Sequence, residues 1–86
     1  MYRIYLTKTA EKDYLYLYQT NKPIFQRVRN TLNAIALDPR QGKPLKFTLK
    51  GKWAYRVGAY RIIYSIEHHI LTVYVLDIGH RRDIYR

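Results

Sequence analysis

The period of the hydrophobic pattern changes near residue 38, and this change restricts the possible folds more than any other feature. Between residues 10 and 38 the apolar residues recur every three or four positions, as in Ala10, Tyr14 and Leu17, which is the spacing of an amphipathic helix. After the turn-forming stretch 38–44 (DPRQGKP) they alternate with polar residues, as in half-buried strands. The sequence therefore predicts a helical half followed by a sheet half.

The helical half contains two helices joined by a very short link. We expect a strand over residues 2–6, followed by a helix that Thr7 or Thr9 caps. Pro23 suits the first turn of a second helix, which ends near Asp38 because the next residue is a proline. The two helices are expected to form a hairpin.

Three strands are expected in the sheet half, over residues 53–57, 60–67 and 70–78. The last run is almost continuously apolar, which predicts a central strand buried on both faces. The element order predicts an α+β fold in a single domain over residues 1–86. In this fold the helical hairpin packs on one face of a twisted, mainly antiparallel, four-stranded sheet that includes the N-terminal strand.

Composition excludes several functional classes. The 86 residues are 48% hydrophobic, which suffices for one core. The absence of cysteine excludes disulfide scaffolds, thiolate zinc sites and cysteine nucleophiles. No HExxH or EF-hand pattern occurs, and we expect neither a metal nor a cofactor. The apolar run 70–76 is far shorter than the roughly 20 residues of a membrane span, which favours a cytoplasmic protein without membrane contact.

The charge balance points to an anionic partner. Sixteen lysines and arginines against six aspartates and glutamates give a net charge of +10. So basic a surface attracts nucleic acid or an acidic protein. The stretch from residue 43 to residue 61 contains no acidic residue and six basic ones: Lys43, Lys46, Lys50, Lys52, Arg56 and Arg61. A second basic cluster follows the last expected strand: His80, Arg81, Arg82 and Arg86.

Strand alternation gathers part of this charge on one face. Ala54 and Arg56 point to the same side of their strand, and the tight turn after it brings Arg56 close to Arg61. Two neighbouring arginines repel each other unless an anion lies between them. The pair therefore predicts an anion site, and a solvated sheet face with scattered arginines is the alternative interpretation.

Arginine and tyrosine without a set of metal ligands suit the cleavage of RNA by its own 2′-hydroxyl. That reaction needs a base, cations that stabilise the phosphorane, and a proton for the leaving 5′-oxygen. Tyr85 can act as the base where neighbouring arginines favour its ionised form, and Arg81 and Arg82 lie close to it in sequence. His80 is the alternative acid or base, because imidazole titrates near neutral pH.

The stretch LKGKWAYRVGAYRIIYSI, followed by an apolar strand and then IGHRRDIYR, resembles the RelE/ParE superfamily of bacterial and archaeal toxins. The resemblance is specific over residues 49–86 and looser over the first strand and the helices. For the RelE branch it implies a ribosome-dependent endoribonuclease that cuts mRNA in the A site. It also implies a hetero-oligomeric complex with a cognate antitoxin, which we expect to be acidic and partly disordered when free.

The resemblance assigns catalytic roles residue by residue. Arg61 matches the transition-state arginine, and Arg56 matches one of two basic residues on the preceding strand. Ala54 falls where the second of these, a lysine, would be, so the site is one cation short unless Lys52 reaches into it.

The remaining roles fall on the C-terminal motif and on the lysines. Arg81 or Arg82 matches the proton donor, and Tyr85 matches the general base. The residues that we expect to bind RNA or ribosome phosphates are Lys46, Lys50, Lys52 and Arg82.

Two other functions remain open. A ParE-like toxin would inhibit DNA gyrase by protein contact, without cutting RNA. A non-catalytic basic RNA-binding relative would account for the charge but not for Tyr85. The arginines and Tyr85 together favour cleavage, whereas Ala54 does not.

Overall fold

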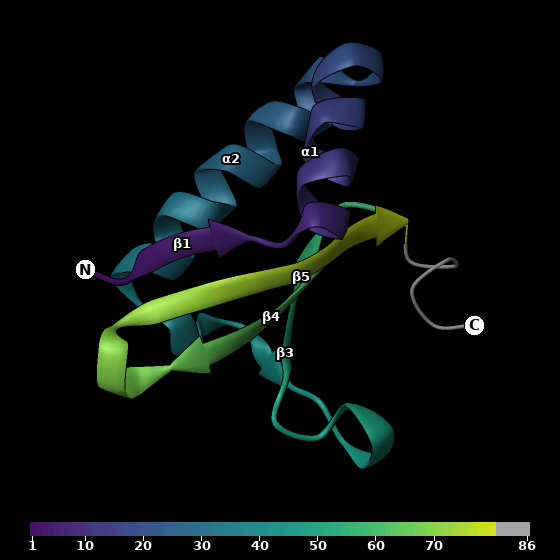
Figure 1. The fold of residues 1–86 in the computed structure, drawn as a ribbon. Helices are drawn as coiled ribbons and strands as arrows, with labels where there is room; N and C mark the ends of the chain where they lie inside the picture. Colours follow the sequence, from purple (N-terminus) through teal and green to yellow (C-terminus); the bar gives the residue numbers. More distant parts are fainter. Residues whose placement is uncertain (81–86) are drawn as a thin grey trace.

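The computed structural model describes residues 1–80. Two helices, α1 (Lys8–Thr20) and α2 (Lys22–Leu37), lie together on one face of a five-stranded sheet (Figure 1). The strands follow one another across the sheet in the order β1-β5-β4-β3-β2. Their bounds are β1 Arg3–Leu6, β2 Lys43–Pro44, β3 Trp53–Val57, β4 Tyr60–Glu67 and β5 Thr72–His80. Neighbouring strands are antiparallel, except that β1 pairs in parallel with β5. The expected α+β architecture is confirmed.

Side-chain caps set the helix starts: Thr7, one of the two predicted candidates, caps α1, and Asn21, which was not predicted as a cap, caps α2. The Thr7 hydroxyl oxygen accepts a hydrogen bond from the Ala10 amide at 3.3 Å and donates to the Val75 carbonyl at 3.1 Å, so the cap of α1 is tied to β5. The backbone amide of Asn21 donates a hydrogen bond to the Leu17 carbonyl at the end of α1. Its side-chain oxygen accepts a hydrogen bond from the Ile24 amide at the start of α2. One residue thus serves both helices and makes the hairpin tight.

The core fills the space between the helices and the sheet. Its largest fully buried side chains are Tyr64, Leu17, Ile35, Ile62, Val28, Val73 and Val75. Successive residues of a strand point to opposite faces, and Ile62 and Tyr64 of β4 face this core. Arg61 and Ile63 therefore face the open side of the sheet, which α1 and α2 do not cover.

The long apolar strand is inside the sheet but is not buried on both faces. β5 lies between β1 and β4, and its residues Val73, Val75 and Ile78 pack under the helices. Tyr74 and Leu76, between them, are only half-buried. The prediction of burial on both faces is therefore wrong. Its cause is that α1 and α2 both lie on the same side, so the apolar residues on the other face keep contact with solvent.

The sheet has one strand more than the sequence predicts. β2 pairs with the edge of β3, where Lys43 is opposite Ala54 and Pro44 is opposite Trp53. The preceding turn is held by the Tyr64 hydroxyl, which donates to the Pro39 carbonyl at 2.7 Å and accepts from the Gly42 amide at 3.2 Å. Two residues are too few for strand alternation to be recognisable, so this strand depends on a tertiary contact.

Candidate functional site on the open sheet face

The β3–β4 hairpin places two arginines side by side. Arg56 and Arg61 are register partners in this antiparallel pair, which confirms the predicted juxtaposition. Directly opposed residues of an antiparallel pair have Cβ atoms about 4.5–5.5 Å apart. Because Tyr55 and Val57 pack against the core, Arg56 points to the open face. The hairpin therefore presents two guanidinium groups on the same face of the sheet.

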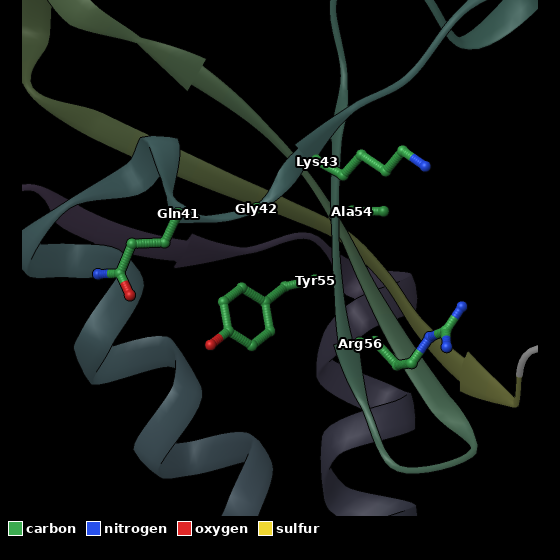
Figure 2. A pocket seen from close by; sticks show the side chains of 6 residues that line it. All are labelled: Gln41, Gly42, Lys43, Ala54, Tyr55 and Arg56. Atoms are coloured by element: carbon green, nitrogen blue, oxygen red, sulfur yellow. The ribbon is translucent and has the colours of Figure 1, made fainter.

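A third basic residue lies beside this pair. Lys43 is opposite Ala54 in register, and Figure 2 shows Lys43, Ala54 and Arg56 pointing to one side of the strands while Tyr55 points to the other. A cavity of about 230 Å³ on the open face is lined by Lys43, Leu45, Ala54, Arg56 and Arg61. An adjoining cavity of about 330 Å³ is lined by Gln41, Gly42, Lys43, Ala54, Tyr55 and Arg56. We call Lys43, Arg56 and Arg61 the cationic cluster.

The cationic cluster is suited to an anion. Of the described residues that line its cavities, none is acidic. Lys43 and Arg56 are exposed and can reach a ligand, whereas Arg61 is half-buried and its Nε atom is shielded from solvent. A partly buried cation on a rigid strand keeps its orientation before the ligand arrives, which is the property that electrostatic catalysis requires. Lys43 belongs to the basic stretch of the sequence, but its place beside Arg56 could not be predicted there, because the two-residue strand β2 has no recognisable pattern.

His80 lies on the other face of the sheet. It is the last residue of β5 and the register partner of Tyr60, and the two rings meet edge to face with centroids 5.6 Å apart. Its neighbour Gly79 is the partner of Arg61. His80 lines a cavity of about 390 Å³ that α1 helps to form, together with Asp13, Tyr16, Leu17, Tyr60, Ile78 and Gly79. The structure therefore does not bring His80 together with the cationic cluster.

The other predicted residues surround this face or lie beyond the described chain. Lys46 and Lys50 flank a short 3₁₀ turn, Phe47–Leu49, and both are exposed. Lys52 is half-buried just before β3, and the cavities of the cationic cluster do not include it among their described lining residues. Arg81, Arg82 and Tyr85 lie outside the described residues.

The cavity beside His80 holds a carboxyl group with an altered pKa. Asp13 Oδ2 accepts a hydrogen bond from the Ile78 amide at 3.2 Å. Burial raises the pKa of Asp13 to about 6; the Ile78 amide acts in the opposite direction, and the Asp77 carboxyl adds to the rise. Relative to the unfolded chain, the folded protein therefore favours the protonated form of Asp13, which predominates below about pH 6.

Replacing Asp13 with asparagine should flatten the pH dependence of stability. Between the ordinary pKa of 3.8 and about 6, the folded state binds more protons than the unfolded state, so wild-type stability falls as pH rises through this range. Asparagine cannot ionise, and its side-chain oxygen can still accept from Ile78. Allowing for solvent screening, the difference in the free energy of unfolding between the wild type and Asp13→Asn should change by about 1 kcal/mol from pH 4 to pH 7. Urea unfolding at both pH values measures it, and parallel pH profiles would contradict the assignment.

No group of three or more histidine, aspartate and glutamate side chains within residues 1–80 is arranged to hold a metal ion. No helix in this part of the chain is long and apolar enough to cross a membrane.

The fold and the cationic cluster define a class: small basic α+β proteins with a cationic face on the open side of the sheet. Residues 4–85 match the family described as the ParE toxin of the type II toxin-antitoxin system, parDE. The toxin YoeB of Synechocystis is 33% identical over 76 residues, covering 83% of this chain and 88% of YoeB. The toxin RelG of Mycobacterium tuberculosis is 47% identical over 47 residues, covering 55% of this chain but only 54% of RelG.

Solved structures agree with this class. The RelBE2 toxin-antitoxin complex of Mycobacterium tuberculosis contains a chain that matches with a TM-score of 0.79 and 33% identity, over 93% of this chain and 98% of that one. The Escherichia coli RelBE complex matches with a TM-score of 0.77 over 93% of this chain and 96% of that one, and at 15% identity it shows the fold alone. The chain belongs to the ParE toxin family, within the RelE/ParE superfamily. It is a toxin of a type II toxin-antitoxin system, of RelE/YoeB type.

Proposed function

We propose that this toxin is a metal-independent endoribonuclease that cuts mRNA in the ribosomal A site and thereby inhibits translation. The observation that supports it most is the register pairing of Arg56 with Arg61 on an open sheet face. A phosphorane carries more negative charge on its oxygens than the phosphodiester from which it forms. Two guanidinium groups beside one cavity, of which that of Arg61 is partly buried, would stabilise that added charge selectively and lower the barrier.

The proposed reaction is an intramolecular transesterification. A base takes the proton of the 2′-hydroxyl, and the 2′-oxygen then attacks the adjacent phosphorus. The bond from phosphorus to the 5′-oxygen breaks, and that oxygen receives a proton from an acid. The products are a 2′,3′-cyclic phosphate and a 5′-hydroxyl. Arg56 and Arg61 would contact the phosphate oxygens, Arg81 would donate the proton, and Tyr85 would be the base, with His80 as the alternative.

The ribosome has a defined part in this proposal. A tyrosine base and an arginine acid are both weak proton-transfer groups at neutral pH. Holding the 2′-oxygen in line with the leaving oxygen is an orientation effect that can contribute several kcal/mol, and the A site would supply it. The toxin would accordingly act in the cytoplasm, and it should cut free RNA poorly.

The ends of the cut RNA test the proposal. Purified toxin is mixed with ribosomes that carry a defined mRNA codon in the A site, and the fragments are analysed for their termini. A 5′-hydroxyl and a cyclic or 3′-phosphate are expected, whereas a 5′-phosphate would exclude attack by the 2′-hydroxyl. Gyrase-dependent DNA breaks without cut mRNA would instead support the ParE-like alternative.

The lysines before β3 should contribute to binding and not to chemistry. Lys46, Lys50 and Lys52 do not line the cavities of the cationic cluster. Changing all three to alanine should weaken ribosome or RNA binding. The slope of log binding constant against log salt concentration should become shallower by roughly 0.7 for each lost phosphate contact to a single strand. Titration of binding at several salt concentrations measures this effect.

A matched control separates this effect from the loss of net charge. The triple alanine variant of Lys8, Lys12 and Lys22 removes the same charge from the helices and should keep the wild-type salt dependence. In the first triple variant, cleavage at saturating toxin should survive. A variant that binds normally but does not cut would place these lysines in the active site.

The cognate antitoxin is the expected protein partner. Solved relatives include toxin-antitoxin complexes, among them YoeB-YefM of Staphylococcus aureus and RelBE2. We infer that the antitoxin of this chain is acidic and partly disordered when free, because a toxin with a net charge of +10 attracts such a segment. The two proteins would form a hetero-oligomer that covers the basic face.

A further inference from the structure

The cationic cluster contains a lysine on a strand where none was expected. On β3, Arg56 faces the cavity, but position 54 carries only a methyl group. Lys43 comes from the neighbouring strand β2 and lines the same cavity. We propose that Lys43 is a catalytic residue that contacts the scissile phosphate and supplies the cation that Ala54 lacks. This inference rests on the proposed function, and it concerns the same site.

The register explains how a lysine on β2 can act at position 54. Lys43 and Ala54 are directly opposed, so their Cβ atoms leave adjacent strands on the same face, about 4.5–5.5 Å apart. Ala54 is 7% exposed, and its methyl group projects only a short distance from the sheet. The long stem of Lys43 can therefore extend over it, toward Arg56 and Arg61, into the volume that a lysine at position 54 would occupy.

The backbone beside Lys43 is held in place by close contacts. Gly42 donates its amide to the Tyr64 hydroxyl, which itself donates to the Pro39 carbonyl. A Cβ atom at Gly42 would overlap the Tyr64 hydroxyl and would lie 2.8 Å from the Ala54 carbonyl oxygen. Burial raises the pKa of Tyr64 to about 12, so its hydroxyl stays protonated and keeps donating. Close approach at this point requires glycine, and it sets the position from which Lys43 extends.

Lys52 is the other lysine that could have replaced the missing cation. It lies two residues before Ala54, just outside β3, and its carbonyl accepts a hydrogen bond from the Leu45 amide at 2.9 Å. The described lining of the two cavities includes Lys43 but not Lys52. The geometry therefore favours Lys43 as the third member of the site. As a flexible point charge, its ammonium can follow the phosphate oxygens from the ground state to the phosphorane.

The first experiment separates chemistry from binding. Lys43→Gln keeps most of the side-chain length and removes the charge. Its single-turnover cleavage of A-site mRNA at saturating toxin should fall by about 10- to 100-fold, because a charged donor to the phosphorane is lost; a fixed donor contributes about 10²–10³, and a flexible lysine contributes less. Lys12→Gln, which removes the same charge from the exposed side of α1, should cut at the wild-type rate. An unchanged saturating rate for Lys43→Gln, with only weaker binding, would overturn the proposal.

A rescue variant excludes a merely structural role for Lys43. Adding Ala54→Lys to Lys43→Gln returns the cation to β3, on the same face and beside the same cavity. The double variant should regain at least half of the lost rate on a logarithmic scale, and Ala54→Lys alone should remain active. If Ala54→Lys alone is active but the double variant stays as slow as Lys43→Gln, the cation of Lys43 does not act at this position.

A measurement without RNA distinguishes this inference from the proposed function. Inorganic phosphate is titrated into the full-length toxin, and the backbone amide resonances of Ala54 and Arg61 are followed by NMR. Lys43→Gln should weaken phosphate binding at least threefold, and Lys12→Gln should not. If the wild type cuts no RNA but shows this dependence, the proposed function fails and the anion site stands. If the wild type cuts RNA and neither assay responds to Lys43→Gln, only the inference about Lys43 fails.

Discussion

Replacing Arg61 with alanine should lower the single-turnover cleavage of A-site mRNA by about 10²–10³. Arg61 lies in register with Arg56, lines the cavity of the cationic cluster and has a buried Nε atom, so its guanidinium is oriented before substrate binds. Its contact with the phosphate strengthens as charge develops, and its loss should therefore reduce the rate more than the affinity. The cleavage rate at saturating toxin and the toxin concentration that gives half of this rate, measured for both proteins, check this expectation.

The control must remove the same charge at a distance from the sheet face. Arg29→Ala meets this requirement, because Arg29 is an exposed residue of α2 that donates a hydrogen bond to Gln26 on the same helix. It should cut at the wild-type rate. A fall of similar size in both variants would mean that net charge, not the placement of Arg61, governs cleavage.

Changing Tyr85 to phenylalanine should reduce cleavage by about 10²–10⁴ if its hydroxyl is the general base. The change deletes a single oxygen atom, so the affinity for programmed ribosomes should remain. The sequence places Arg81, Arg82 and Arg86 close to Tyr85, and cations of this kind favour the phenolate. The measurement is again the single-turnover rate, together with its pH dependence, since loss of the base should also remove the rise of the rate with pH.

Tyr18→Phe is the matched control for this variant. Tyr18 is an exposed tyrosine of α1 whose ring packs on Phe25, and phenylalanine preserves that contact. Equal rates for the wild type and Tyr85→Phe would remove Tyr85 from the mechanism. His80 would then be the next base to test, although its ring packs against Tyr60 on the helix side, so it would have to turn away from that ring to reach the cationic cluster.

Much of the fold follows from local rules that the sequence displays. The change of hydrophobic period separates the helices from the strands, and Thr7, Asn21 and Pro23 set the helix ends where side-chain caps and a fixed φ favour them. The two-residue turn after Val57 decides which residues of β3 and β4 are opposed. The pairing of Arg56 with Arg61 could therefore be predicted from the sequence alone.

The tertiary structure decided the features that depend on contacts between distant segments. β5 has one open face because both helices pack on the same side, and an apolar run by itself does not reveal this. His80 faces the helices because β4 and β5 pair with a register shift at Ile63 and Tyr64, which strand alternation in one segment does not show.

The position of Lys43 depends on contacts between segments that are far apart in the sequence. The Tyr64 hydroxyl bonds Gly42, which lies 22 residues away in sequence, and this bond places the two residues of β2 against the edge of β3. The sequence by itself determined the charge of the site and its two arginines, because periodicity and turn length are local properties. Only the tertiary structure placed Lys43 opposite Ala54, because a two-residue strand has no period of its own and is held by hydrogen bonds to segments far along the chain.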